Sequence, residues 1–277
     1  MATVQALLEC AGDLCTDSGG RDAQILLAHC LDKPRAWLYA WPEHEVASAA
    51  RAQYEQLLAR RRCGEPIAYL IGQRDFWTLQ LAVNEHTLIP RPETETLVEW
   101  ALELAVPADA SVLDMGTGSG AIALAVASER PHWRVTGVDN SAGALQVANA
   151  NAQRAQLSRV CFLRSDWYQA LAGSAFHLVL GNPPYIDAAD AHLERGDVRF
   201  EPRSALVAPE KGLADLARLV AGAPAHLHPG AWLLLEHGYT QGAAVRRLFR
   251  EAGFKAIATR RDLAGHERVT GAAWHVE

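Results

Sequence analysis

The most informative segment of the chain is Val112-Leu113-Asp114-Met115-Gly116-Thr117-Gly118-Ser119-Gly120-Ala121-Ile122. An apolar strand runs into a glycine-rich turn and then into the start of a helix. Open α/β sheets bind ligands at such turns, beyond the carboxyl ends of their strands. Gly116 and Gly118 would allow the backbone to turn sharply and to approach a ligand closely. Because glycine is common in tight turns between a strand and a helix, the turn alone is weak evidence for a cofactor loop.

The glycine spacing and one acidic residue narrow the kind of cofactor. A dinucleotide fingerprint has the spacing G-x-G-x-x-G and places a pyrophosphate at the helix N-terminus. Here the glycines follow G-x-G-x-G, and Asp114 stands where the strand enters the turn. A carboxylate suits a cationic amino group better than a pyrophosphate. The loop therefore disfavours a nicotinamide enzyme.

Strands and helices alternate around this loop. Helical stretches, such as Ala121–Arg130 and Ala142–Ala155, separate the first five strand-like runs. This alternation predicts right-handed βαβ units and a parallel sheet covered on both faces, an α/β fold of the Rossmann type. The expected strands are Ser111–Met115, Trp133–Asp139, Val160–Arg164, His177–Gly181 and Ala231–Glu236, with later candidates at Ala256–Arg260 and Ala272–Val276.

The first part of the chain has a different pattern. Apolar residues at helical spacing form one stripe from Val4 to Leu14, and further helices are expected near Asp22–Leu31 and from about Ala47 to Arg62. Phe76-Trp77 and Leu79–Val83 then alternate like a hairpin, with its turn at Asn84-Glu85. We expect a small all-helical domain at 1–70, a β-hairpin linker at 71–90 and an open α/β domain at 91–277.

Composition excludes several classes of protein. Of the 277 residues, 49% are hydrophobic and 21% charged, which favours a globular chain over a disordered one. No apolar run approaches the ~18 residues of a membrane span, and the start lacks a signal-peptide core. The five cysteines form no C-x-x-C pair, which favours a reducing cytoplasm over a disulfide framework. The net charge of −6 argues against a stable nucleic-acid partner.

Two further acidic residues follow successive strands. Asp139 ends the second strand, where an acidic residue can accept both hydroxyl hydrogens of a ribose. Asp166 and Trp167 follow the third strand, where they could read an adenine amino group and stack on its ring. Together with Asp114, these residues favour a nucleoside ligand that lacks phosphates. S-adenosylmethionine fits this description, because it combines a ribose and an adenine with a sulfonium and an amino acid.

The chemical step is suggested by Asn182-Pro183-Pro184-Tyr185, which follows the fourth strand. An NH2 group conjugated to a carbonyl or a ring is a poor nucleophile, but it becomes attackable when acceptors hold its hydrogens and its lone pair faces a methyl donor. The Asn182 side-chain oxygen and the Pro183 carbonyl could be those acceptors, and the Tyr185 ring could stack on the planar group. The motif predicts in-line methyl transfer driven by positioning.

This combination resembles the class I S-adenosylmethionine-dependent methyltransferases with an Asn-Pro-Pro-Tyr signature. That signature is shared by enzymes that methylate adenine N6, guanine N2 or glutamine N5. Four further segments narrow the resemblance to the peptide chain release factor N5-glutamine methyltransferases, almost end to end. These segments are Leu88–Glu95, the Gly72–Trp77 hairpin, Asp197–Pro202 with Ala205-Leu206, and Leu234–Gly238.

The resemblance implies a substrate, a cofactor and a set of site residues. The substrate would be the glutamine of the Gly-Gly-Gln tripeptide of class I release factors, held by the N-terminal domain, and S-adenosylmethionine would leave as S-adenosylhomocysteine. Asn182 through Tyr185 would grip the glutamine amide. The cofactor would be bound by Asp114, Gly116, Thr117, Gly118, Ser119, Gly120, Asp139, Asp166, Trp167 and Asn182.

Some alternatives remain open at this stage. A methyltransferase acting on adenine N6 or guanine N2 of nucleic acid is the main rival, and a regulator that binds the cofactor without chemistry is the second. No metal site is expected, since His226 and His228 have no third ligand at useful spacing. The sequence does not assign roles to Arg91, Glu93, Glu95 or His237, and it does not give the oligomeric state.

Overall fold

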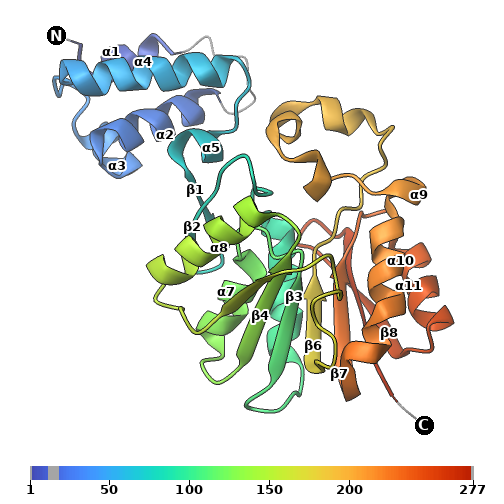
Figure 1. Cartoon of the computed structure of the whole chain (residues 1–277). Coiled ribbons are helices and arrows are strands. Elements are labelled where there is room, and N and C mark those ends of the chain that lie inside the picture. The colour runs from blue at the N-terminus through green and yellow to red at the C-terminus, as the bar shows by residue number, and fades with distance from the viewer. Residues whose placement is uncertain (1, 12–18, 276–277) are drawn as a thin grey trace. The chain divides into compact units, whose positions relative to one another are not determined.

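The computed structural model describes residues 2–11 and 19–275, and the chain folds into two compact units (Figure 1). The first unit runs to Gln73 and includes a later segment, Glu194–Phe200. The second unit comprises Arg74–Leu193 and the chain from Glu201 onward. Each unit is built around buried hydrophobic side chains of its own.

The first unit is helical, as its apolar periodicity predicts. Buried side chains of these helices form one core that includes Leu26, Leu27 and Tyr54. The Thr3 side chain caps the first helix by accepting from the Ala6 amide. The stripe expected to reach Leu14 ends as a helix at Glu9, and Leu14 lies outside the described residues. The elements are α1 (Val4–Glu9), α2 (Gly19–Leu31), α3 (Arg35–Ala40), α4 (Ser48–Arg62), α5 (Ile67–Ile71) and the 3₁₀ turn η3 (Gly196–Phe200).

A buried arginine in the first unit, Arg61, binds the later segment Glu194–Phe200 to the helices. Only 9% of the Arg61 side chain is exposed, and its guanidinium bonds Asp22 at 2.9 Å and Asp197 at 3.0 Å. A charge this deeply buried is stable only when paired and hydrogen-bonded. Arg61 is therefore a structural ion-pair centre that ties α2, α4 and η3 together.

The hairpin forms, but its turn lies elsewhere than expected. β1 (Gln73–Phe76) and β2 (Leu79–Ala82) are joined at Trp77-Thr78, and Trp77 adopts a positive φ of 56°. Two-residue hairpin turns usually place glycine or asparagine at such a position, so the sequence carried no signal for this turn. Asn84-Glu85 does belong to a turn, closed by the Thr87 amide on the Asn84 carbonyl, but that turn follows the hairpin.

The second unit contains a seven-stranded sheet in the order β5-β4-β3-β6-β7-β9-β8. The five strands from β5 to β7 are parallel, as predicted, and β9 runs antiparallel to both of its neighbours. The last strand was expected at Ala272–Val276 but lies earlier, because the buried run that pairs with β7 begins at Val269. The strands are β3 (Ser111–Met115), β4 (Arg134–Asp139), β5 (Cys161–Arg164), β6 (Phe176–Gly181), β7 (Leu227–Glu236), β8 (Lys255–Arg261) and β9 (Glu267–Ala273).

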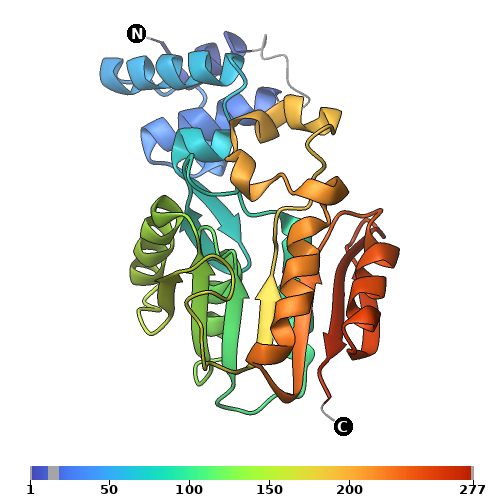
Figure 2. The ribbon, with the colours of Figure 1, turned by 45° about the vertical axis from the view of Figure 1, so that its right-hand side comes forward.

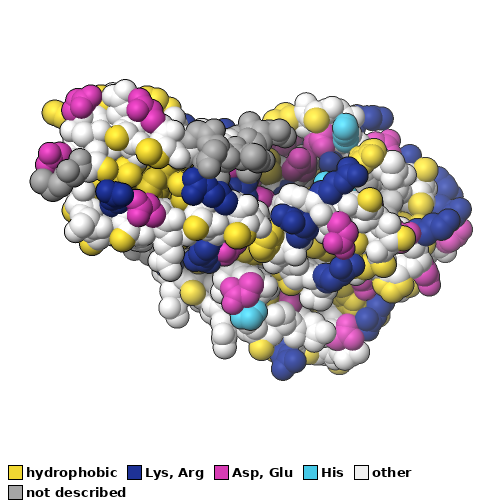
Figure 3. Space-filling view, turned by 90° about the horizontal axis from the view of Figure 1, so that it is seen from above, with side chains coloured by type: hydrophobic (Ala, Val, Ile, Leu, Met, Phe, Trp, Pro, Cys, Tyr) yellow, Lys and Arg dark blue, Asp and Glu magenta, His cyan; other side chains and the backbone are white. Residues whose placement is uncertain are grey.

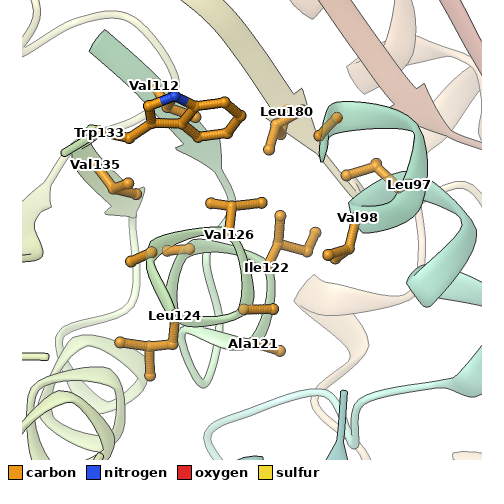
Figure 4. Close-up of a cluster of buried hydrophobic side chains, with 14 of the residues drawn as sticks. Leu97, Val98, Val112, Ala121, Ile122, Leu124, Val126, Trp133, Val135 and Leu180 are labelled. Carbon is orange, nitrogen blue, oxygen red and sulfur yellow. The ribbon is translucent and has the colours of Figure 1, made fainter. Parts of the chain in front are cut away.

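Helices cover both faces of this sheet, which gives the three layers seen in Figures 1 and 2. On one face, α6 (Glu95–Glu103) and α7 (Ala121–Glu129) share a core with β3, β4 and β6. Figure 4 shows Ile122 and Val126 of α7 among strand residues such as Leu180, with Leu97 of α6 beside them. On the other face, α10 (Ala214–Gly222) and α11 (Gly242–Glu251) pack on β3, β6 and β7.

The remaining elements connect these strands and helices along the chain. α8 (Ala142–Arg154) contacts β4 and β5, as expected for the helix after the second parallel strand. None of the described helices combines the length and the hydropathy needed to cross a membrane. The shorter elements are η1 (Pro92–Thr94), η2 (Ala191–Glu194), η4 (Arg203–Ala205), α9 (Pro209–Gly212) and η5 (Ala223–His226).

Candidate active site

A cavity of about 620 Å³ lies beyond the carboxyl ends of β3, β4, β5 and β6. This volume is within the range of small-molecule sites, and the edge of the sheet is where open α/β folds bind ligands. The predicted residues that line it are Gly116, Thr117, Gly118, Ser119, Asp139, Asp166, Trp167, Asn182 and Pro184. The predicted residues outside its lining are Asp114, Gly120, Pro183 and Tyr185.

The glycine loop is held in a tight turn above the sheet. Gly116 and Gly118 have φ values of 69° and 56°, a left-handed conformation that favours glycine. The Thr117 amide donates to the Val138 carbonyl at 2.9 Å, and the Gly118 amide donates to Asp139 Oδ2 at 2.9 Å. The loop is therefore anchored to the end of the neighbouring strand, β4.

The Asp114 side chain is buried in the protein interior and does not line the cavity. Its side chain is fully buried, and Oδ2 accepts from the Thr117 hydroxyl at 2.6 Å and from the Ala123 amide at 3.1 Å. Burial raises its pKa to about 7, although these two hydrogen bonds oppose the rise. The carboxylate thus ties the turn to the first residues of α7, and a direct contact with a ligand amino group remains a prediction.

Asp139 lines the cavity, and two backbone amides orient its carboxylate. Oδ1 accepts from the Ser141 amide at 2.8 Å, while Oδ2 accepts from the Gly118 amide. Burial raises its pKa, and the backbone hydrogen bonds act in the opposite direction. Because each carboxylate oxygen has two lone pairs, both keep a site for a ribose hydroxyl.

Asp166 and Trp167 are positioned by α10. Arg218 forms an ion pair with Asp166 at 2.9 Å, and the Trp167 indole donates to Asp215 at 3.2 Å. Trp167 has a positive φ of 51°, which is unusual for a large side chain. Sequence reasoning missed Arg218 and Asp215, because nothing in the helical periodicity of α10 indicates which of its residues face the cavity.

Asn182 lies at the cavity, and its amide group is oriented by a residue far away in the chain. Its Nδ2 donates to the hydroxyl of Thr94 at 3.2 Å, across 88 residues. Thr94 is buried at the junction of η1 and α6 and also lines the cavity. This bond uses one of the two Nδ2 hydrogens, and Oδ1 is the group of Asn182 that can accept from a ligand.

Tyr185 is held at both of its ends, by the last residue of β7 and by the segment that follows this strand. Its hydroxyl donates to Glu236 Oε1 at 3.2 Å, and its carbonyl accepts from Gln241 Nε2 at 2.9 Å. Burial and the neighbouring Glu236 carboxylate raise the pKa of Tyr185. The phenol is thus committed to the protein, and a contact of the ring with a substrate remains a prediction.

Glu236 is a buried acidic residue that the sequence analysis did not single out, although it stands at the end of a strand. It ends β7 after three buried leucines, the same position that made Asp114 and Asp139 noteworthy. Its side chain is buried, and Oε2 has no hydrogen-bond partner among the described residues. Burial raises its pKa to about 7.

Most residues whose roles were left open support the structure. Arg91 forms an ion pair with Glu201, whose side chain is fully buried. Glu95 accepts from the Trp77 amide at 2.8 Å and so fixes the hairpin turn. His237 is buried, and its ring nitrogens lie 2.9 Å from the Gly238 carbonyl and 2.8 Å from the Thr270 hydroxyl.

His226, just before β7, and His228, within that strand, both pack against aromatic rings. His226 stacks on Tyr168 with ring centroids 4.7 Å apart, and His228 packs against His177. Among the described residues, no group of three or more His, Cys, Asp or Glu side chains is arranged to hold a metal ion.

Comparison with known proteins identifies the family. One family model, the PrmC N-terminal domain, matches residues 2–72, and another, the methyltransferase small domain, matches residues 94–197. The release factor glutamine methyltransferase of Pseudomonas aeruginosa is 52% identical over 274 residues, which cover 99% of this chain and 99% of that protein. The chain belongs to the release factor glutamine methyltransferase family.

Two further comparisons agree with this assignment. The release factor glutamine methyltransferase of Vibrio cholerae is 50% identical over 273 residues, 97% of this chain and 96% of its own length. A methyltransferase of Pyrococcus furiosus has a TM-score of 0.56 at 15% identity and covers 80% of this chain and 100% of its own, which supports the fold alone. The expected α/β methyltransferase fold and the expected family are thus confirmed.

Proposed function

We propose that this chain transfers the methyl group of S-adenosylmethionine to the side-chain amide nitrogen, N5, of the glutamine in the Gly-Gly-Gln motif of class I peptide chain release factors. The modification would support translation termination in the cytoplasm. The observation that carries the proposal is the Asn182 amide at the cavity, with Nδ2 bound to Thr94 and Oδ1 left to accept an N–H. A planar NH2 group is the acceptor that such an oxygen would orient.

The residues around the cavity fit S-adenosylmethionine. Asp139 keeps lone pairs for a ribose, Trp167 offers an aromatic ring, and the loop from Gly116 to Ser119 lets backbone approach the ligand. Of the three arginines that line the cavity, Arg91 and Arg218 are engaged in ion pairs, and Arg164 donates to the Asn140 carbonyl at 3.1 Å. These features favour a nucleoside without phosphates, and the bound cofactor would supply an electrophilic methyl group and leave as S-adenosylhomocysteine.

The residues of the Asn-Pro-Pro-Tyr motif would act by positioning the glutamine. The Asn182 oxygen and the Pro183 carbonyl would hold the two N–H hydrogens, so that the nitrogen lone pair points at the methyl carbon. As the nitrogen gains positive charge, these two acceptors would stabilise it more strongly, and one proton would then leave to water. The Tyr185 ring, anchored through Glu236 and Gln241, would cover the planar amide.

The helical domain at 1–70 would hold the body of the release factor, with the hairpin at 71–90 as the linker to the catalytic domain at 91–277. Deleting about residues 1–70 should lower turnover on intact release factor far more than turnover on a short Gly-Gly-Gln peptide. Equal losses on both substrates in a truncated protein that still binds S-adenosylmethionine would contradict this role.

A competition between acceptors tests the proposed function. The protein is incubated with labelled S-adenosylmethionine and, separately, with release factor, duplex DNA and ribosomal RNA. Acidic and basic side chains are interspersed over the described residues of the face in Figure 3, which suits a protein substrate better than a phosphate backbone. Label should enter release factor, and label in nucleic acid alone would overturn the proposal.

A further inference from the structure

A buried asparagine of α8 holds backbone groups from two distant parts of the chain. Only 1% of Asn151 is exposed. Its Oδ1 accepts from the Ala82 amide at 2.7 Å, and its Nδ2 donates to the Ala82 carbonyl at 3.0 Å and to the Ser119 carbonyl at 2.9 Å. Both Nδ2 hydrogens are thus used, and the side chain joins the end of β2 to the glycine loop.

The three partners determine which way the Asn151 amide points. A backbone N–H can only donate and a carbonyl can only accept, so Oδ1 faces the Ala82 amide and Nδ2 faces the two carbonyls. The paired bonds to Ala82 are those that a neighbouring strand would make to β2. An aspartate of the same shape has no N–H to donate, so when ionised it could make only the first of the three bonds.

The two segments that Asn151 joins both border the cavity. Ser119 lines it directly, and the chain that continues from Ala82 lines it from His86 to Leu88. The His86 ring lies against the start of α8, because a Cβ added to Gly143 would come within 2.7 Å of it. The spacing between the glycine loop and the segment after β2 therefore depends on the Asn151 side chain.

The segment after β2 is held at its other end by a different group. The Ile89 amide donates to Glu201 Oε2 at 3.0 Å, and Arg91 forms an ion pair with the same buried carboxylate. Because this end is fixed, a displacement of Ala82 would move the cavity-lining residues that lie between the two anchors.

We infer that Asn151 is a positioning residue of the cofactor site, which sets the Ser119 carbonyl and the segment after β2 at the spacing that the cofactor requires. Asn151 lies outside the cavity lining and acts through Ser119 and Ala82. The inference rests on the proposed function, because it takes S-adenosylmethionine as the ligand of the glycine loop. Such coupling is reciprocal, so the bound cofactor also stabilises the bonds between Asn151 and Ala82.

Two substitutions separate this role from a general contribution to packing. Asn151→Asp keeps the size of the side chain and an acceptor for the Ala82 amide, but it loses both donors and places a carboxylate against two carbonyls. Asn151→Ala loses all three bonds. Asn149→Asp is the matched control, because Asn149 is an exposed asparagine on the same helix.

The experiment measures the Kd of S-adenosylmethionine by calorimetry and kcat on release factor at saturating cofactor. Asn151→Asp should raise the Kd roughly 5- to 30-fold, the effect of one to two lost hydrogen bonds, and Asn151→Ala should raise it at least as much. For both variants, kcat should stay within about twofold of wild type, since a residue that acts on cofactor binding leaves the chemical step unchanged. Asn149→Asp should match wild type in both quantities.

Hydrogen exchange in the wild-type protein tests the same coupling without a substitution. Because Asn151 holds the Ala82 amide, saturating S-adenosylmethionine should slow the exchange of that amide. The Arg134 amide, which donates to the Ala110 carbonyl at the amino edge of the sheet, is the reference. The cofactor should slow exchange at Ala82 more than at Arg134.

Three results would overturn the inference. These are a folded Asn151→Asp or Asn151→Ala protein that binds S-adenosylmethionine as tightly as wild type, a fall in kcat as large as the rise in Kd, or equal responses of the Ala82 and Arg134 amides to the cofactor. If neither variant folds, the exchange measurement decides. A wild-type protein that bound no S-adenosylmethionine would instead contradict the proposed function itself, which is a distinct outcome.

Discussion

The carboxyl edge of the sheet has two halves that are built differently. At the ends of β3 and β4, the acidic side chains are oriented mainly by groups close to them in the chain, as when the Ser141 amide donates to Asp139. At the ends of β6 and β7, the corresponding groups are oriented by distant side chains, such as Thr94 across 88 residues and Glu236 across 51. The first half would hold the cofactor and the second would hold the group to be methylated.

This difference suggests different tolerances to substitution. A local backbone hydrogen bond persists when a distant side chain changes, so the cofactor half should respond mainly to its own residues. The acceptor half depends on pairs of side chains from distant parts of the chain, and the losses caused by substituting the two members of one pair should be coupled. Substitutions in each half test this contrast.

The largest effect is expected for Asn182→Ala. Loss of a preorganised polar group at the reacting centre costs on the order of 10²–10³ in turnover, by analogy with an oxyanion-hole donor. Turnover is measured at saturating S-adenosylmethionine, with cofactor affinity measured alongside. Asn149→Ala on the exposed side of α8 is the control, and near-normal turnover in Asn182→Ala would remove this residue from the chemical step.

The second prediction concerns stability and pH at Glu236. Its pKa in the folded protein is about 7 against an ordinary 4.5, so its contribution to stability is fully present below about pH 4.5 and is lost as pH rises through about 7. Glu236→Gln lacks this titration. Its free energy of unfolding should therefore match that of wild type at low pH and exceed it at pH 8, on the order of 3 kcal/mol.

Denaturant titrations at several pH values test this prediction. Asp114, whose pKa is also raised to about 7, is present in both proteins and cancels in the comparison. A variant that is more stable but less active would show that the charge serves function at the expense of stability. A stability difference independent of pH would contradict the assigned burial of the charge.

The third prediction tests the cofactor half. Asp139→Ala should weaken S-adenosylmethionine binding by ~1.5–3 kcal/mol, the range for hydrogen bonds to a charged group. Calorimetry gives the affinity, and Asp109→Ala is the control, since Asp109 is an exposed acidic residue at the opposite edge of the sheet. An unchanged Kd in a folded Asp139→Ala protein would reject its role in holding the ribose.

The smallest effect is expected for Tyr185→Phe. Removing the hydroxyl leaves both oxygens of the buried Glu236 without a full hydrogen bond, which should cost ~1–3 kcal/mol of stability at pH 8. Tyr239→Phe is the control, because Tyr239 lies three residues after Glu236 but is 60% exposed. Equal changes in melting temperature for the two variants would argue against the Tyr185–Glu236 bond.

The fold was largely predictable, because its signals are local. Alternating strands and helices led to the correct parallel sheet, and the strand at Ser111–Met115 has its expected bounds. The hairpin turn was misplaced because Trp77 adopts a positive φ without being glycine or asparagine. The final strand was misplaced because its buried run is set by pairing with β7, which no local pattern reports.

The site was predictable only where its residues follow strand ends in the sequence. Asp139, Asp166 and Asn182 were found by that rule and line the cavity. Asp114 followed the same rule but is buried against α7, so the rule identifies an edge of the sheet and not the direction of a side chain. Thr94 precedes a helix, and its part in orienting Asn182 depends on a contact that only the folded chain creates.

The position of the transferred methyl group tests the central claim most directly. Release factor incubated with the wild-type protein and labelled S-adenosylmethionine is digested, and the modified residue is located by tandem mass spectrometry. The account predicts the label on the side-chain nitrogen of the glutamine in Gly-Gly-Gln, and its near absence with Asn182→Ala. Label on any other residue, or the same label at the same rate with Asn182→Ala, would contradict it.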